Sequence, residues 1–336
     1  MSYDTTTLLG VIQGLRPQNT FLIDLLCPAA VTFGTKEIDF DKLTDEYKLA
    51  PFVSPVVAGK ANVKAGALLQ KFSPAYVKPK DVIDPERVLK RLPGEGIGGT
   101  LTPAQRADAI RADIIDDQRK RIRRREEWML AQLLRTGKVV VAGENYPSVE
   151  VDFGRTGTLT KTLSSDARWS ESASTPNDDL EAWMGLVDAP TTHIIMGRGA
   201  YRKYINHAST EKLINTQLGS DTKLDMAPAQ MFASYKGRLG SAGPEIWTYS
   251  GWYHDDTGAK TLYIADNQVV LVSTGAAGVR AYGAILDGAS GYAEAELFPK
   301  NWTENDPPVE YIMTQSAPLP VIPLINSTLC ANVYTL

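Results

Sequence analysis

The residues of this chain that could do metal or acid–base chemistry are three histidines and two pairs of adjacent aspartates. A histidine metal site needs ligands at short regular spacings such as HxH or HExxH, and neither occurs at His193, His207 and His254. The acidic pairs at 178–179 and 255–256 could hold a cation, but each has a structural interpretation. The first opens a helical pattern, where the helix dipole favours negative charge, and the second opens a turn. We therefore expect no bound metal.

Two glycine-containing segments could bind a phosphate or a dinucleotide. The Gly-Arg-Gly turn at 197–199 lies between a predicted strand and a predicted helix, but Arg202 replaces the third glycine of the dinucleotide fingerprint. The glycine-rich segment 94–99 follows no strand and lacks the Lys-Ser/Thr ending of a phosphate-binding loop. No GxSxG nucleophile motif is present. We predict that the protein has no cofactor and is not an enzyme.

The densest charge cluster is the run 119–125, which holds six basic residues in seven positions. One interpretation is non-specific contact with nucleic acid phosphates, through Arg119, Lys120, Arg123 and Arg124. The other is a solvated helix face, in which Asp116 and Asp117 pair with the bases one turn later and the acids at 126–127 balance the far end. Because acids flank the run on both sides, the solvated face is favoured.

A long helix should carry this run. Residues 102–105, Thr-Pro-Ala-Gln, combine an N-cap threonine, a proline at the first helical position and a capping-box glutamine. Gly137 stands where a C-terminal cap glycine belongs. Between them an apolar stripe has a gap at Gln118 and consists of Ile110, Ile114, Ile122, Met129 and Leu133. A helix over 103–135 would be about 50 Å long and must lie along something extended.

Before the helix, residues 51–80 have the composition of an extended arm. They include five lysines, no Asp or Glu, and prolines spaced so as to exclude a helix or a central strand. An arm whose apolar residues cannot be buried at home should lie on an acidic surface of a second subunit. The residues predicted to make these contacts are Val53, Val56, Val57, Lys60, Lys64, Leu68, Leu69, Lys71, Phe72, Tyr76 and Lys78.

The rest of the chain alternates helix and strand patterns, which predicts a mixed α+β fold. Helices are predicted over 178–187 and 199–218, strands over 138–142, 149–153, 191–196, 246–249, 261–265 and 269–273, and extended chain over 299–320. The net charge of −4 argues against nucleic-acid binding by the whole molecular surface. Two cysteines cannot form a disulfide framework, and no segment is typical of a signal peptide or a membrane helix. We expect a soluble protein without a membrane partner.

Several motifs resemble the lambda-like branch of tailed-phage major capsid proteins. The most specific are Pro-Lys-Asn-Trp at 299–302 and Gln-Ser-Ala-Pro-Leu at 315–319. The other motifs follow in the family's order along most of the chain, at 53–59, 76–80, 89–93, 149–155, 235–237 and 249–251. The match is loosest over 156–230.

The resemblance implies the Hong Kong ninety-seven capsid fold, an α+β fold with an N-terminal arm, an extended loop (E-loop), a peripheral P domain and an axial A domain. On this chain the N-terminal arm is expected at 1–44 and the E-loop at 45–85. The P domain is expected at 86–164 and 281–320, with its spine helix at 103–135. The A domain is expected at 165–280 and 321–336.

The resemblance also implies a function and partners. The chain is expected to self-assemble into hexamers and pentamers of an icosahedral shell that encloses double-stranded DNA in the virion, after assembly in the host cytoplasm. Expected partners are further copies of itself, a scaffolding protein, a portal and a decoration protein. The DNA contacts would then be inner-surface contacts of Arg119, Lys120, Arg123 and Arg124. The P-domain motif would be Pro299, Lys300, Asn301 and Trp302.

Three alternatives remain open. Some relatives crosslink an E-loop lysine to a P-domain asparagine, for which Lys60 or Lys64 and Asn301 have suitable residue types, although lambda-like members generally lack the reaction. An encapsulin-like nanocompartment shell has the same fold without a viral genome. A monomeric nucleic-acid-binding protein built on residues 119–125 is the third.

Overall fold

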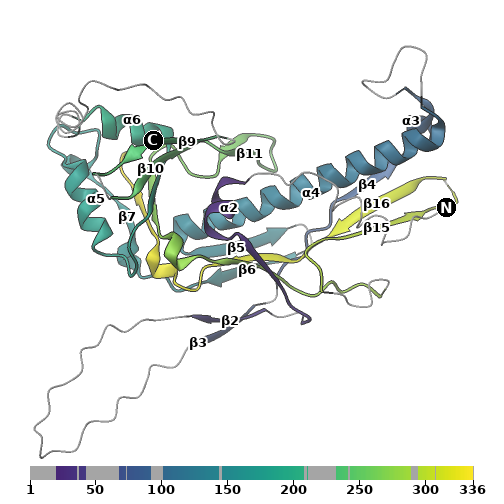
Figure 1. Ribbon diagram of the computed structural model, residues 1–336, viewed down its shortest axis with the longest axis horizontal. Coiled ribbons are helices and arrows are strands. Elements are labelled where there is room, and N and C mark those ends of the chain that lie inside the picture. Colours follow the sequence, from purple (N-terminus) through teal and green to yellow (C-terminus); the bar gives the residue numbers. More distant parts are fainter. Residues whose placement is uncertain are drawn as a thin grey trace, which may run out of the picture.

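The computed structural model describes residues 20–35, 38–42, 68–72, 74–91, 101–143, 146–207, 210, 232–240, 243–288, 294–306 and 308–335. The molecule is elongated, with one long helix crossing much of its length (Figure 1). A sheet with two short helices lies at one end of this helix, and a narrow three-stranded sheet lies along the other end. This arrangement confirms the predicted α+β class.

The long helix, α4 (Pro103–Thr136), begins and ends where the sequence predicts, within one residue. Thr102 and Gln105 form the capping box, with Gln105 N donating to Thr102 Oγ1 at 3.3 Å and Thr102 N donating to Gln105 Oε1 at 2.9 Å. At the other end Gly137 adopts φ +76° and its N–H donates to Leu133 O at 2.7 Å. The side chain of Arg155 completes this cap by donating to two last-turn carbonyls at 2.6 and 2.8 Å. We call α4 the spine helix.

The sheet along the N-terminal half of the spine helix has the antiparallel order β15-β16-β4. A second hairpin, β5 with β6, follows the spine helix directly, as predicted. The bounds of these strands and of the short helix α3 are β4 Lys80–Ile83, β15 Phe298–Thr303, β16 Glu310–Gln315, β5 Lys138–Gly143, β6 Tyr146–Asp152 and α3 Pro85–Leu89.

The larger sheet has the order β7-β18-β13-β8-β10-β9. Its central strand β13 is buried along its whole length, because helices cover one face of the sheet and the rest of the molecule covers the other. Its elements are β7 Thr160–Thr162, β8 His193–Met196, β9 Ala233–Arg238, β10 Glu245–Tyr249, β13 Gln268–Val272, β18 Leu329–Asn332, α5 Pro176–Met184 and α6 Arg198–Ile205. The predicted helix over 199–218 is confirmed as far as Ile205 but ends there, because Asn206 and His207 form a turn. Residues 208–209 and 211–218 lie outside the described residues.

Smaller elements join these two parts. The helix α2 (Phe21–Leu26) packs across the spine helix, and the strand after it joins a sheet of order β1-β14-β17 (Figure 1). The hairpin of β2 and β3 runs away from the body of the molecule. The remaining strands are β1 Ala29–Thr32, β14 Val279–Tyr282, β17 Pro318–Val321, β2 Ile38–Lys42, β3 Leu68–Phe72, β11 Trp252–His254 and β12 Lys260–Leu262.

The apolar stripe of the spine helix is buried along its whole length. Ile110, Ile114, Ile122, Met129 and Leu133 are each at most 6% exposed. Ile110 and Ile114 pack with Ile83 and Ile312 against the narrow sheet, whereas Met129 and Leu133 join the central core. One helix face therefore links two separate hydrophobic cores, which explains why the helix must be long.

Candidate functional site

No catalytic or metal-binding constellation is formed by the predicted polar residues. His207 is buried and lies 3.2 Å from Ser174, His193 lies 3.6 Å from Glu245, and His254 is exposed. Among the described residues, no group of three or more His, Cys, Asp or Glu could hold a metal ion. In the same part of the chain, no helix is long and apolar enough to cross a membrane.

The Gly-Arg-Gly turn has a packing role. A Cβ on Gly197 would collide with the Ala265 carbonyl, and a Cβ on Gly199 would collide with the Tyr334 hydroxyl. Both glycines allow the start of α6 to approach the neighbouring backbone closely. This geometry supports the structural interpretation of the turn.

The gap in the apolar stripe is filled by a satisfied polar group. Gln118 is fully buried, and its Nε2 donates to Asp81 Oδ2 at 2.8 Å and to Ile312 O at 3.0 Å. Its Oε1 accepts from the Thr314 hydroxyl at 2.7 Å. These bonds join the spine helix to β4 and β16. Because a buried amide tolerates few other partners, they fix the position of the helix along the sheet.

The P-domain motif predicted from the sequence lies on β15, beside the spine helix. Asn301 Nδ2 donates to Glu310 at 2.8 Å, and Arg111 makes a bidentate pair with the same carboxylate. Burial raises the pKa of Glu310, but these hydrogen bonds hold it below its ordinary value overall. The amide of Asn301 is thus held by an ionised carboxylate. Lys60 and Lys64 lie outside the described residues, so the alternative of a crosslink to Asn301 stays open.

The rest of this motif packs through aromatic and ionic contacts. The Trp302 and Tyr311 rings stack with centroids 5.4 Å apart, and Lys80 Nζ lies 3.8 Å from the Tyr311 centroid. Lys300 forms an ion pair with Asp287. Pro299 is buried at the start of the strand. The motif therefore stabilises the narrow sheet of its own subunit.

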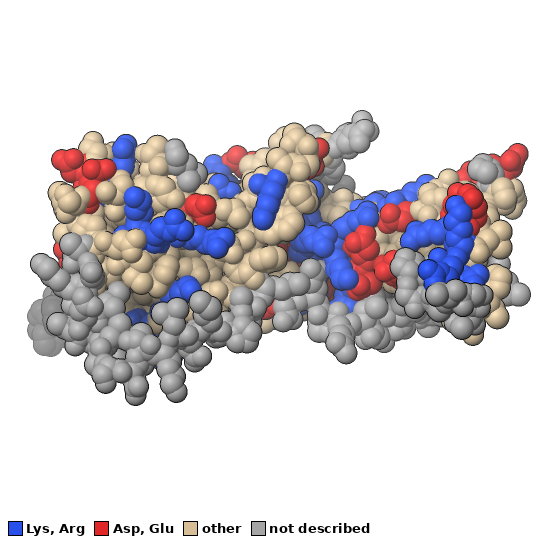
Figure 2. All heavy atoms as spheres, turned by 90° about the horizontal axis from the view of Figure 1, so that it is seen from above, with Lys and Arg blue, Asp and Glu red and all other residues tan. Residues whose placement is uncertain are grey.

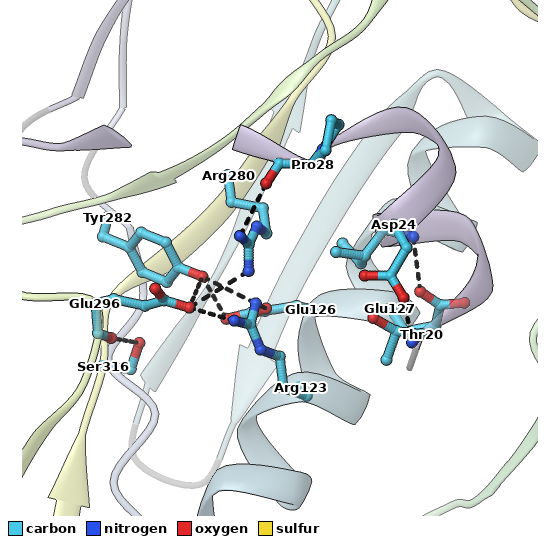
Figure 3. Close-up of polar contacts among 11 residues, drawn as sticks. Thr20, Asp24, Pro28, Arg123, Glu126, Glu127, Arg280, Tyr282, Glu296 and Ser316 are labelled. Carbon is cyan, nitrogen blue, oxygen red and sulfur yellow. Dashed lines mark hydrogen bonds and ion pairs between the residues drawn. The ribbon is translucent and has the colours of Figure 1, made fainter. Parts of the chain in front are cut away.

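Two adjacent carboxylates lie where the spine helix meets the rest of the molecule (Figure 3). Glu126 is 1% exposed and accepts from Arg123 Nη1 at 2.8 Å and from the Tyr282 hydroxyl at 2.9 Å. Arg123 also pairs with Glu296, which lies 3.3 Å from Arg280 Nη1. Glu126 thus belongs to a buried ionic network with an arginine of its own.

Glu127 faces α2 and β10. It is 2% exposed, and its Oε1 and Oε2 accept from the backbone N–H groups of Leu22 and Ile23 at 2.9 and 3.0 Å. The Tyr249 hydroxyl donates to Oε1 at 2.8 Å. Within the described part of the chain, no lysine or arginine pairs with this carboxylate. One side chain therefore joins the spine helix, α2 and the larger sheet.

Burial raises the pKa of Glu127 to about 7, although its three hydrogen bonds act in the opposite direction. Burial also raises the pKa of Glu126 to about 7, against the influence of Arg123 and Tyr282. The interpretation of these two acids as solvated partners of the basic run is therefore wrong. Glu126 lies four residues after Ile122 and three before Met129, so its place within the apolar stripe was the signal that pointed to burial.

The basic run divides between exposed and inward-facing side chains. The predicted pairs Asp116–Lys120 and Asp117–Arg121 form at 2.5 and 2.6 Å, which supports the solvated-face interpretation. Of the four candidate DNA contacts, Arg123 points into the ionic network, Arg119 is half-buried, Lys120 is paired and Arg124 is exposed. Figure 2 shows Lys and Arg in a broken band along one face of the molecule, with Asp and Glu beside them.

An aromatic cleft of about 700 Å³ lies beside the exposed end of the run. The spine helix supplies three arginines and Trp128, and the β11–β12 hairpin supplies the opposite wall. Trp128 Nε1 donates to the Tyr253 hydroxyl at 3.1 Å, and Arg125 lies over the Trp128 ring. The lining residues include Arg121, Arg124, Arg125, Phe232, Trp252, Tyr253 and Tyr263.

The predicted inter-subunit arm is described only in part. Val53, Val56, Val57, Lys60 and Lys64 lie outside the described residues, and only the backbone of Leu68, Leu69 and Lys71 is described, in β3. Phe72 is 8% exposed and packs into the central core of its own subunit. The Tyr76 hydroxyl donates to Ala284 O at 2.6 Å, and Lys78 lies over the Tyr76 ring. Phe72, Tyr76 and Lys78 therefore pack within their own subunit at the C-terminal end of the arm.

Comparisons with known proteins match the chain to phage capsid proteins in both sequence and structure. The family model described as phage major capsid protein E matches residues 4–333. The major capsid protein of Enterobacteria phage P21 is 31% identical over 330 residues, covering 96% of both chains. That of Escherichia phage lambda is 31% identical over 326 residues, covering 94% of this chain and 95% of the other. A crystal structure of a prophage capsid protein from Escherichia coli CFT073 superposes with a TM-score of 0.78 at 26% identity, covering 99% of this chain and 100% of that one.

Proposed function

This chain belongs to the phage major capsid protein E family, and from that membership we propose that its copies assemble as hexamers and pentamers into an icosahedral shell around double-stranded DNA. It is a major capsid protein of the lambda-like type, a structural protein of the virion shell with the Hong Kong ninety-seven capsid fold. The observation that carries the proposal is the match to capsid proteins over nearly the whole length of both chains. Host cytoplasm is the proposed place of assembly.

The proposed domain division assigns an assembly role to each part. The N-terminal arm (1–44) and the E-loop (45–85) reach neighbouring subunits, the P domain (86–164 and 281–320) forms the periphery, and the A domain (165–280 and 321–336) surrounds the symmetry axes. The hairpin of β2 and β3, which leaves the body of the molecule, supports the E-loop assignment. An extended arm can add backbone hydrogen bonds and apolar contacts to a neighbour, and closed symmetry then satisfies every copy.

Deletion of residues 55–75 tests the E-loop assignment. The deletion should leave subunits that fold, because Phe72 is the one hydrophobic side chain of the central core among those the structure describes in that range. Assembly should fail, as seen by negative-stain imaging and sedimentation. Normal shells from the deleted chain would contradict the assignment.

Charge reversal at Lys64 and Lys71 tests the proposed acidic surface on the neighbouring subunit. If both charge-reversed variants assemble as well as the wild type, that surface is refuted.

The proposed DNA contact centres on Arg124. Its side chain is exposed and forms no ion pair with the described residues. Its matched control is Arg87, an exposed arginine on the short helix α3. DNA-filled heads carrying Arg124→Glu should release their genome at a lower temperature than wild-type heads, because a phosphate contact becomes a repulsion. Heads carrying Arg87→Glu should behave as wild type. Equal release temperatures for all three would remove Arg124 from the DNA-contacting surface.

The partners proposed besides DNA are a scaffolding protein, a portal and a decoration protein. Expression of the chain with and without its neighbouring genes, followed by negative-stain imaging, separates self-assembly from scaffold-dependent assembly. The contents of purified shells decide against the alternative of an encapsulin-like nanocompartment. We expect packaged DNA, and enzyme cargo without DNA would favour the nanocompartment. The relatives, named as a prophage-derived major head protein and as phage major capsid proteins, favour the phage shell.

A further inference from the structure

Glu127 attaches the N-terminal arm to the spine helix through an unusual contact. A carboxylate with no cationic partner in the described chain accepts hydrogen bonds from the backbone N–H groups of Leu22 and Ile23, in the first turn of α2, and from the Tyr249 hydroxyl. Its neighbour Glu126 is equally buried but has Arg123 as a partner. Burying an ionised carboxylate without a cation costs free energy, and a buried group of this kind tends to become neutral instead.

We propose that docking of α2 on the spine helix is coupled to uptake of a proton by Glu127, so that the arm is held most firmly at mildly acidic pH and loosens as the pH rises. The proposal depends on contacts within one chain, not on the shell.

The geometry accommodates the proton without moving a heavy atom. Glu127 Oε1 lies 2.8 Å from the Tyr249 hydroxyl, which now donates to it. When Oε1 carries the proton, that hydrogen bond reverses: the carboxyl O–H donates to the hydroxyl oxygen, and the hydroxyl proton turns away. Oε2 still accepts from Ile23 N at 3.0 Å, and Oε1 keeps a lone pair toward Leu22 N at 2.9 Å. The protonated form therefore keeps both bonds to the arm.

The surroundings of Glu127 favour the neutral form. The titratable and charged groups that face it are Asp24 and Cys27 on α2, Arg123 and Glu126 on the spine helix, Tyr249 on β10 and Tyr263 after β12. Of these Arg123 is positive, and it is engaged by Glu126 and Glu296. Arg121, Arg124 and Arg125 line the cleft that Glu127 also borders, but none of them pairs with this carboxylate among the described residues. Asp24 adds a second negative charge close by. No ion pair in the described chain therefore compensates the charge of Glu127.

The direction of the pH dependence follows from the two states of the arm. With α2 docked, the pKa of Glu127 is raised to about 7; with α2 released and water admitted, it returns toward the ordinary 4.5. The docked state therefore binds more protons between these values. Docking is fully favoured below the lower pKa and is weakened as the pH rises through the upper one. Between pH 5.5 and pH 8 the docking equilibrium should weaken roughly 30-fold.

Hydrogen exchange on unassembled subunits tests the coupling. The probe is the protection of the α2 amides, corrected for the intrinsic pH dependence of exchange and expressed relative to amides of β13 in the core. In the wild type, this relative protection should fall roughly 30-fold from pH 5.5 to pH 8. Glu127→Gln should abolish the pH dependence, because an amide cannot titrate. With its nitrogen facing Tyr249, its oxygen still accepts from Ile23 N, whereas the bond from Leu22 N is lost, so overall protection of α2 should be lower than in the wild type at acidic pH.

The matched control is Glu126→Gln, the same change at an equally buried neighbour that makes no bond to α2. This variant should keep the pH dependence of α2 protection. The proposal is overturned if Glu127→Gln retains the wild-type pH dependence or if Glu126→Gln removes it. Should either variant fail to fold, the wild-type comparison still decides, since equal corrected protection at the two pH values would overturn it. Either result leaves the shell proposal standing.

Discussion

Replacing Gln118 by leucine should destabilise the subunit, although leucine completes the apolar stripe of the spine helix. The amide fills a fully buried position and has three partners, at 2.8 Å on Asp81, 3.0 Å on Ile312 and 2.7 Å on Thr314. In the Gln118→Leu variant each of these three polar groups loses its hydrogen bond to the amide and needs another partner. The cost is therefore set by which of them water can reach.

The three partners differ in their access to water. The side chain of Asp81 is 28% exposed and lies near Arg121, so it loses little. The Thr314 hydroxyl is fully buried, as is the contact with the Ile312 carbonyl. Each buried group left without a partner costs about 1–3 kcal/mol. The larger apolar surface of leucine returns about 1–2 kcal/mol. The net loss in the free energy of unfolding should be about 2–3 kcal/mol.

Equilibrium urea unfolding of unassembled subunits, followed by tryptophan fluorescence, measures this loss. The double variant Gln118→Leu/Thr314→Val removes the stranded hydroxyl together with its former partner. It should recover about 1 kcal/mol relative to Gln118→Leu alone, because replacing both members of a hydrogen-bonded pair costs less than stranding one. A single variant within about 0.5 kcal/mol of the wild type, or a double variant no more stable than the single, would refute the reasoning.

Three further expectations concern the end of the spine helix and the thiols. Arg155→Met should lower the free energy of unfolding by about 2–3 kcal/mol, because two last-turn carbonyls lose a charged donor; an unchanged urea midpoint would contradict this. Gly137→Ala should cost about 1–2 kcal/mol, since φ is +76° and a Cβ would lie 2.6 Å from the Arg155 Cβ. Its thermal unfolding temperature should drop by a few degrees, and that of the control Gly157→Ala, where a Cβ meets nothing within 4 Å, should not. Burial raises the pKa of Cys27 to about 12 and that of Cys330 to about 11, so both thiols should resist a thiol reagent at pH 8 until urea unfolds the chain. Rapid labelling of native subunits would show that they are accessible.

The parts of the fold that were predictable from sequence are those set by local signals. The spine helix is bounded by a capping box at Thr102 and a left-handed glycine at Gly137, and each signal acts within a few residues of the end it fixes. The turn after β11 is equally local, because Asp255 accepts from its own neighbours and Gly258 adopts φ +82°. The parallel pairing of β1 with β14 joins residues about 250 positions apart, and no local pattern specifies it.

The candidate site divides in the same way. The pairs Asp116–Lys120 and Asp117–Arg121 were predictable, because one helical turn determines them. The burial of Glu126 and Glu127 depends on partners distant in sequence, among them Tyr282, Leu22 and Tyr249. Charge alone suggested solvent exposure for both. Only the helical phase of Glu126 within the stripe carried a contrary signal. The inter-subunit role of the arm stays a prediction.

The attachments of the spine helix also determine how it can carry a load. Gln118 ties it to the narrow sheet, and Glu127 ties it to α2 and to the larger sheet. Between these two fixed points the helix spans about 14 Å, at 1.5 Å per residue. A torque that turns one sheet relative to the other is therefore carried in part by this segment of the helix. The same segment carries the basic run 119–125, in which Arg123 is held by Glu126 and Glu296, so the run contributes a third attachment between the two fixed points.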